Sequence, residues 1–195
     1  MPTKQTIPYS FGTFFITFTC CRWLPLLEIT AGYDIVYDWF NHLKSKGHFI
    51  NGYVIMPNHV HVLISFRRTD QLINTIIGNG KRFMAYQIVK RLEQSNKSDL
   101  LADLAGSVEQ SRRSNNKKHD IWEPSFDWKE CNSDRFTDQK LNYIHMNPCA
   151  GKWHLSKAPG TYIHSSCKFY DTGVQGIYSV EHVENMKDIS LGTWI

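Results

Sequence analysis

The chain has 195 residues, of which 42% are hydrophobic, and a formal net charge of +4. This composition excludes an intrinsically disordered chain, and no apolar run approaches the roughly 20 residues that cross a bilayer. The five cysteines are odd in number and form no Cys-x-x-Cys pair, which excludes a disulfide framework or a zinc ribbon. Residues 1–5 lack the order of a signal peptide, so we expect a cytoplasmic protein without a membrane partner.

Seven segments have the residue pattern of regular secondary structure. Aromatic and β-branched runs predict strands, and apolar residues three and four apart predict helices. In chain order we expect a strand at 14–19, a helix at 31–46, strands at 48–56 and 59–66, a helix at 71–93, a strand within 119–130 and a helix at 134–147. Between them, residues 94–118 predict a helical extension that ends in a basic loop at 111–118.

This order predicts an α+β fold of the split ferredoxin-like type. A βαββαβ chain forms an antiparallel sheet with two helices on one face. The other face is left open, and the helix at 134–147 is available to cover it. We expect residues 1–150 to form one domain and residues 151–195 to form a C-terminal extension packed on it, with a short helix near 180–186.

Two histidines, His59 and His61, are separated by one valine in the third predicted strand. Because successive strand residues point to opposite faces, both imidazoles lie on one face, while Val60 and Val62 point into the core on the other. Neutral imidazole is a common ligand of divalent metals. Such a pair by itself is more often a surface or packing feature, so a metal site requires a third ligand.

The helix at 134–147 supplies a candidate for that ligand. Tyr143 and Asn147 are four residues apart, so they share one helical face. If this face lies over the two histidines, the Asn147 carbonyl becomes a third metal ligand and Tyr143 points at the same metal. A tyrosine can act as a covalent nucleophile, and a divalent ion can polarise a phosphate. His145 points elsewhere on the helix and is expected to be structural.

Two motifs in this order resemble a known family. Met56-Pro57-Asn58-His59-Val60-His61-Val62-Leu63 is followed about eighty residues later by Tyr143-Ile144-His145-Met146-Asn147-Pro148. Together they resemble the single-tyrosine HUH transposases (His, hydrophobic, His), and most closely the REP-associated tyrosine transposases. Weaker matches support the resemblance and extend it over residues 14 to about 170: Phe15-Ile16-Thr17-Phe18, Asp138-Gln139-Lys140-Leu141, Tyr162-Ile163-His164-Ser165-Ser166 and Tyr170.

The resemblance implies a function for each part of the motif. Tyr143 would be the nucleophile, and His59, His61 and Asn147 would bind Mg²⁺ or Mn²⁺. The partner would be single-stranded DNA near a hairpin, which is cleaved and rejoined through a 5′-phosphotyrosine link. Four basic residues are candidates for DNA contacts: Arg22, Lys81, Arg82 and Lys140. Relatives include dimers that exchange the tyrosine helix as well as monomers, so a homodimer stays an open alternative.

The chain departs from the family pattern at three positions. Met146 and Cys149 replace residues that are often Asn and Val in relatives, and neither is an expected ligand. Near Asp127 many relatives carry a histidine, so Asp127 either adds a metal contact or alters DNA binding. Residues after Tyr170 match poorly, and their role is open.

Two other functions fit the same residues. One is a ferredoxin-like nucleic-acid-binding module without chemistry, in which the histidines contact phosphate or base. The other is a metal-dependent phosphodiesterase in which water attacks in place of Tyr143. A covalent protein–DNA adduct that Tyr143→Phe abolishes distinguishes the transposase from both.

Overall fold

The computed structural model describes residues 6–108, 117–151 and 153–193. Its sheet contains four antiparallel strands in the order β2-β3-β1-β4. The strands are β1 (Gly12–Thr19), β2 (Phe49–Met56), β3 (His59–Phe66) and β4 (Asp127–Glu130). Two long helices, α2 (Tyr33–Ser45) and α3 (Ile73–Gln94), complete a βαββαβ arrangement. The predicted ferredoxin-like α+β fold is confirmed.

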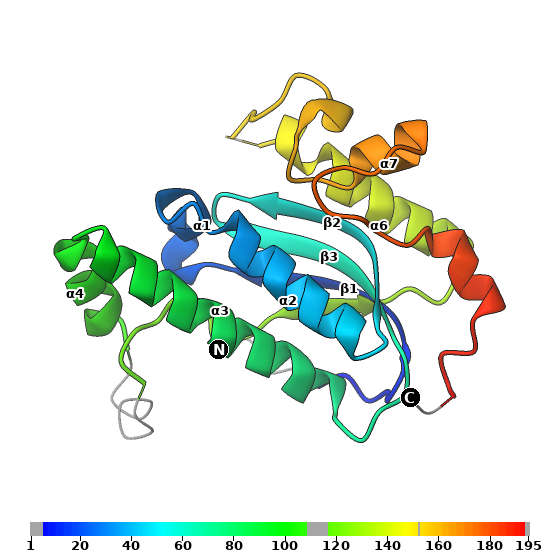
Figure 1. The fold of residues 1–195 in the computed structure, drawn as a ribbon, viewed down its shortest axis with the longest axis horizontal. Coiled ribbons are helices and arrows are strands. Elements are labelled where there is room, and N and C mark those ends of the chain that lie inside the picture. Colours follow the sequence, from blue (N-terminus) through cyan, green and yellow to red (C-terminus); the bar gives the residue numbers. More distant parts are fainter. Residues whose placement is uncertain (1–5, 109–116, 152, 194–195) are drawn as a thin grey trace.

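The main core lies between the sheet and the helices α2 and α3, which run across the same face of the sheet (Figure 1). Alternate residues of β1 and β3 point into it, as the strand period requires: Phe14, Ile16, Phe18, Val60, Val62, Ile64 and Phe66. Helices α2 and α3 approach closely at Gly80, where an added Cβ would lie 2.1 Å from Trp39 Nε1. Glycine at this position therefore sets the spacing of the two helices.

The opposite face of the sheet is covered by α6 (Asp134–Met146). A second, smaller core joins Leu141 and Ile144 of this helix to Phe15, Val54 and Leu63 of the sheet. At Gly52 an added Cβ would lie 2.5 Å from Leu141 Cδ2, so glycine lets the helix lie close to β2. The expected position of the tyrosine helix, on the face that α2 and α3 leave open, is thus the observed one.

Short elements fill the connections between these parts. They are η1 (Cys21–Trp23), α1 (Leu26–Ile29), α4 (Ser98–Gly106), η2 (Asn147–Cys149), η3 (Pro159–Thr161), α7 (Cys167–Thr172) and η4 (Val183–Asp188). The predicted helical extension is a separate helix, because the chain turns at Asn96, whose φ of 53° ends α3. Most of the predicted basic loop at 111–118 lies outside the described residues.

The C-terminal residues lie along the free edge of β2. Ser166 N donates to Tyr53 O at 3.0 Å, and Ile55 N donates to His164 O at 2.9 Å. Further along, Glu181 N donates to Ile50 O at 2.9 Å. These bonds satisfy backbone groups that an edge strand would otherwise leave unpaired. The short helix expected near 180–186 corresponds to η4.

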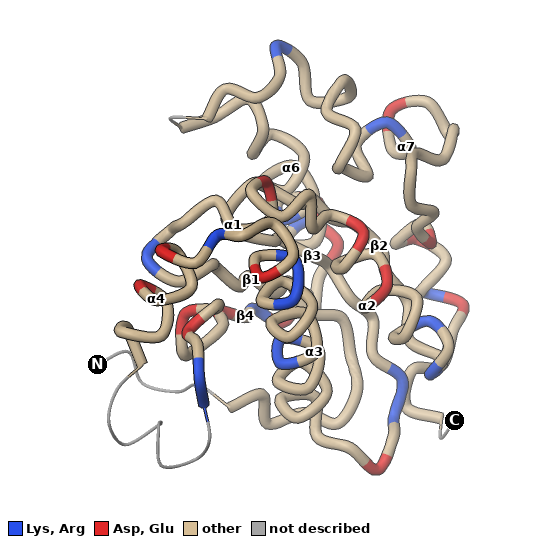
Figure 2. Tube along the Cα trace, turned by 60° about the vertical axis from the view of Figure 1, so that its left-hand side comes forward, with Lys and Arg blue, Asp and Glu red and all other residues tan. Residues whose placement is uncertain are grey.

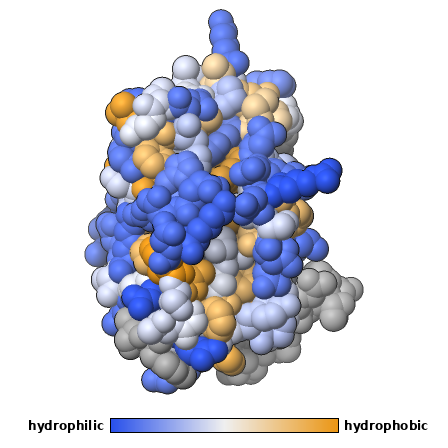
Figure 3. Space-filling view, turned by 90° about the vertical axis from the view of Figure 1, so that its right-hand side faces the viewer, coloured by the Kyte–Doolittle hydropathy of each residue, from blue (hydrophilic) through white to orange (hydrophobic). Residues whose placement is uncertain are grey.

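The outer surface carries mixed character. Figure 3 shows hydrophilic residues interspersed with small apolar patches on the side of the molecule that faces right in Figure 1. No helix within the described ranges is both long and apolar enough to span a bilayer. The homodimer and the cytoplasmic location stay predictions.

Candidate active site

The site is built on the first residues of β3. His59 and His61 lie on the face that α6 covers, with only 7% and 4% of their surface exposed. Their ring centroids are 4.7 Å apart. On the neighbouring strand β1, Thr17 pairs with His61, and the Thr17 hydroxyl lies 2.7 Å from His61 Nδ1. The Nε2 nitrogen of His61 is left for another partner.

The hydrogen bonds of Asn58 determine which nitrogen of His59 carries its proton. Asn58 Nδ2 donates to Trp23 O at 3.2 Å, which fixes the orientation of the amide. Its Oδ1 then accepts from His59 Nδ1 at 2.7 Å. The proton of neutral His59 therefore lies on Nδ1, and Nε2 is a bare acceptor that faces Asn147 Oδ1 at 3.1 Å.

Burial keeps both imidazoles neutral. Desolvation lowers the pKa of His59 to about 4, against a smaller opposing effect of the Asn147 contact. Desolvation, together with smaller effects of the neighbouring His59 and the Lys140 ammonium, lowers the pKa of His61 to about 3. A neutral imidazole is the form that binds a metal, so no proton has to leave at neutral pH.

Helix α6 and Asn147, which directly follows it, bring the Tyr143 ring and the Asn147 amide to the two histidines. The Tyr143 ring centroid is 5.0 Å from that of His61, and the ring stands edge-on to Phe15 at 5.9 Å. The Tyr143 side chain is 50% exposed, so it faces both the histidines and solvent. The four residues singled out by sequence, from strand and helix motifs more than eighty positions apart, therefore meet at one place above the sheet.

His145 holds this helix in position, as its expected structural role requires. It is buried, and its Nε2 lies 2.9 Å from Ser166 Oγ. Ser166 Oγ also accepts from Tyr53 N at 2.9 Å, which ties α6 to β2 through the C-terminal segment. Desolvation lowers the pKa of His145 to about 4, so this contact is made by the neutral ring.

The donor set fits a divalent ion. Two acceptors without a hydrogen between them, His59 Nε2 and Asn147 Oδ1, face each other, and a cation shared by both removes their repulsion. Rotating the Asn147 amide would relieve it instead by placing an N–H there. In the described part of the chain, no group of three or more His, Cys, Asp and Glu residues could hold a metal. This site is of a different kind, because its third donor is the amide oxygen of Asn147.

Lys140, one of the four cations expected to contact DNA, lies beside the tyrosine. Lys140 Nζ lies 5.0 Å from the Phe15 ring centroid and 5.9 Å from that of Tyr143. Arg22 follows β1, but its guanidinium forms an ion pair with Asp103 of α4. Lys140 is therefore the cation best placed beside the tyrosine.

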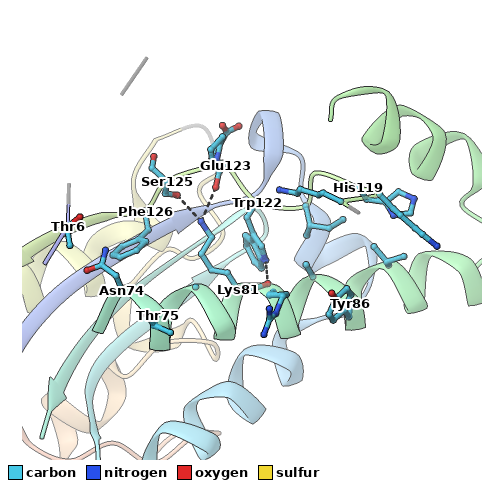
Figure 4. A pocket seen from close by; sticks show the side chains of 18 of the residues that line it. Thr6, Asn74, Thr75, Lys81, Tyr86, His119, Trp122, Glu123, Ser125 and Phe126 are labelled. Atoms are coloured by element: carbon cyan, nitrogen blue, oxygen red, sulfur yellow. Dashed lines mark hydrogen bonds between the residues drawn. The ribbon is translucent and has the colours of Figure 1, made fainter. Parts of the chain in front are cut away.

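Lys81 is a correction to the sequence-based prediction. Its place beside the apolar stripe of α3 predicted an accessible ammonium, but the residue is 8% exposed. Figure 4 shows Nζ between two carbonyl oxygens, Glu123 O at 2.9 Å and Ser125 O at 2.8 Å. The ammonium fastens the segment before β4 to α3, so we withdraw Lys81 as a phosphate contact.

Arg82 lies on the same side of the sheet as Lys81. It lines a groove of about 970 Å³ between α3 and residues 117–126, and its guanidinium donates to Asn79 Oδ1 at 3.2 Å. Figure 2 shows Lys and Arg at several places along α3, on the helix layer that packs against the other face of the sheet. Arg82 is therefore not near the histidines.

Asp127 lies on the same face as the histidines. The register of β1 and β4 pairs it directly with Thr17, the residue whose hydroxyl contacts His61. Its side chain is exposed. Directly paired residues of neighbouring strands share a face, which places this carboxylate one strand away from His61.

Sequence reasoning missed the residues that orient the imidazoles. Thr17 and Asn58 do so by hydrogen bonds, and Trp23 lies with its ring centroid 5.7 Å from that of His59. The pairing of β1 with β3 was the available signal for Thr17. Nothing in the sequence around Trp23 indicates its position, because it depends on an irregular turn.

Comparison with solved structures places this arrangement among known folds. A REP-associated tyrosine transposase bound to a REP hairpin matches 100% of this chain over 99% of its own length, with 19% identity and a TM-score of 0.61. The two chains share one fold. A protein from Deinococcus radiodurans, provisionally named a transposase, matches 74% of this chain over 95% of its own, with 18% identity. Its TM-score of 0.41 is too low to support an argument.

No protein-family model and no curated protein matches the sequence. At 19% identity the first likeness establishes the fold alone. The chemistry has to be argued from the side chains of this chain.

Proposed function

We propose that this protein is a metal-dependent transposase that cleaves and rejoins single-stranded DNA through a covalent bond to Tyr143. The observation that carries the proposal is the meeting of Tyr143 and Asn147 with His59 and His61 on the face opposite α2 and α3. The shared fold with a tyrosine transposase bound to a REP hairpin supports DNA, and a hairpin in particular, as the substrate.

The proposed reaction exchanges one phosphate ester for another. The Tyr143 oxygen attacks phosphorus, a Tyr–O–P bond forms to the phosphate that stays on the 5′ end of the downstream strand, and the P–O3′ bond breaks. The phenol loses its proton and the departing 3′ oxygen gains one, so that strand end leaves as a 3′-hydroxyl. Attack by a 3′-hydroxyl on the phosphotyrosine reverses these steps, and the strand is rejoined without a nucleoside cofactor.

His59 and His61 through Nε2, and Asn147 through Oδ1, would hold Mg²⁺ or Mn²⁺. When bound, such an ion polarises the phosphate and offsets its charge during attack. The side chains themselves do the rest. Helix α6 holds the tyrosine beside His61, its half-exposed ring leaves room for a DNA strand, and the Lys140 ammonium faces incoming phosphate.

The test is to incubate the protein with Mn²⁺ and an end-labelled single strand that contains a hairpin, and to separate the products on a denaturing gel. We expect a slowly migrating protein–DNA adduct, its loss in Tyr143→Phe, and its loss in His61→Ala. A Tyr86→Phe variant is the matched control, because Tyr86 is an exposed tyrosine of α3 away from the site.

Two outcomes would contradict the proposal. Cleavage that survives Tyr143→Phe would mean that water attacks and that the protein is a phosphodiesterase. Binding without cleavage in every divalent metal would mean that it is a nucleic-acid-binding module.

A further inference from the structure

Trp23 has an unusual place for a large apolar side chain. It follows β1 at the end of η1, and 57% of its surface is exposed. Its ring stands edge-on to His59, with the centroids 5.7 Å apart. By contrast, Trp39 and Trp122 are buried in the main core. An exposed indole therefore lies at the border of the proposed active site.

The backbone that presents Trp23 is strained. Arg22 and Trp23 have φ values of 52° and 59°. These lie in the left-handed region, which residues with a Cβ atom rarely adopt. Two left-handed residues in succession persist only where the surroundings enforce them, and such strain clusters at ligand sites.

Hydrogen bonds with two distant parts of the chain, Asn58 and residues 121–123, enforce this turn. Cys20 N donates to Asn58 O at 2.8 Å, and Cys21 N donates to Ile121 O at 2.8 Å. Arg22 N donates to Glu123 Oε1 at 2.7 Å. Trp23 O accepts from the amide of Asn58, the residue that also orients His59. The turn and the metal-binding side chain are thus fixed by the same amide.

The turn exposes the Trp23 ring, whereas the charge of Arg22 is paired. The Arg22 guanidinium is engaged with Asp103, whereas the Trp23 ring faces solvent beside the histidines. A rigidly held aromatic face is the group on which single-stranded nucleic acids stack their bases. We infer that Trp23 stacks on a nucleobase of the single strand that enters the site, next to the phosphate that Tyr143 attacks. This inference rests on the proposed function for its ligand class.

The test compares two probes of equal charge: a strand of about 20 thymidines and a strand of about 20 abasic units. Binding is measured by fluorescence anisotropy without added metal, so that cleavage does not enter. Because one stacked base contributes about 5- to 150-fold, we expect Trp23→Ala to weaken thymidine binding by that factor and to leave abasic binding unchanged. Trp23→Phe retains a ring and should keep most of the affinity.

Phe83→Ala is the matched control, because Phe83 is 65% exposed on α3, the helix on the other face of the sheet. It should change neither affinity. Circular dichroism checks that each variant folds, and Trp23→Leu replaces Trp23→Ala if the latter does not.

The inference is overturned if the wild type does not bind the thymidine strand, if the loss in Trp23→Ala is the same on both probes, or if there is no loss. If an adduct forms at Tyr143 but Trp23→Ala does not weaken binding, only the stacking inference fails. A Trp23 effect without an adduct would remove only the proposed chemistry.

Discussion

Mn²⁺ binding should be nearly independent of pH in the acidic range where ordinary histidine sites lose their metal. The perturbation is acidification from about pH 7.5 to about pH 5.5. A histidine must be neutral to bind metal, so each protonated imidazole reduces the apparent affinity. In this protein burial lowers the pKa of His59 to about 4 and that of His61 to about 3, which keeps both rings neutral over that range.

Exposed and buried histidines differ greatly in how far the fraction of metal-binding, neutral imidazole falls over this pH range. For two imidazoles with the ordinary pKa of about 6.5, the fraction with both rings neutral falls about 100-fold over this range. With pKa values of about 4 and about 3, that fraction stays above nine-tenths, so we expect less than about a twofold change.

Isothermal titration calorimetry of Mn²⁺ into the metal-free protein measures this directly. Asn147→Ala is a useful companion, because it should weaken binding about tenfold or more at each pH without adding a pH dependence. A loss of affinity near 100-fold in the wild type would refute the reasoning, since it would show that His59 and His61 take up protons as exposed histidines do.

Three further expectations concern stability. Gly78→Ala should stabilise the fold by about 0.5–1 kcal/mol, because nothing lies within 4 Å of the added Cβ and alanine favours a helix. Gly80→Ala, on the same helix, should destabilise the fold by about 1–3 kcal/mol, because the added Cβ meets the Trp39 ring. Urea unfolding measures the free energy of unfolding of both variants, and equal effects would contradict the described packing. Burial against Phe66 lowers the pKa of His48 to about 4, so the unfolded chain binds a proton there before the folded one does. The wild type should therefore lose about 2 kcal/mol more than His48→Gln between about pH 7.5 and pH 5, and an equal loss in both would show that His48 is not held neutral.

Much of the site follows from simple periodicities in the sequence. A period of two in β3 sends Val60 and Val62 into the core and places both histidines on the other face. Helical spacing places Tyr143 of α6 on the same side as Asn147, the residue that directly follows the helix. The order of elements leaves one sheet face open, and the helix predicted at 134–147 covers it. The two spacings follow from the geometry of a single strand or helix, which the residue pattern indicates directly.

What sequence did not predict depends on contacts between distant segments. Lys81 has the spacing of a helix surface residue, yet the segment before β4 folds over it and supplies two carbonyl oxygens. The left-handed turn at Trp23 is held by Asn58, Ile121 and Glu123, none of them near it in the chain. Neither environment leaves a periodic signal.

The most direct measurement of the central claim is mass spectrometry of the adduct after proteolysis. The protein is reacted with a single-stranded hairpin substrate and Mn²⁺, the DNA is trimmed with nuclease, and the modified peptide is sequenced. We predict a nucleotide joined through its 5′ phosphate to the oxygen of Tyr143, and no such peptide from Tyr143→Phe. A nucleotide on a different residue, or cleaved DNA without any modified peptide, would contradict the account.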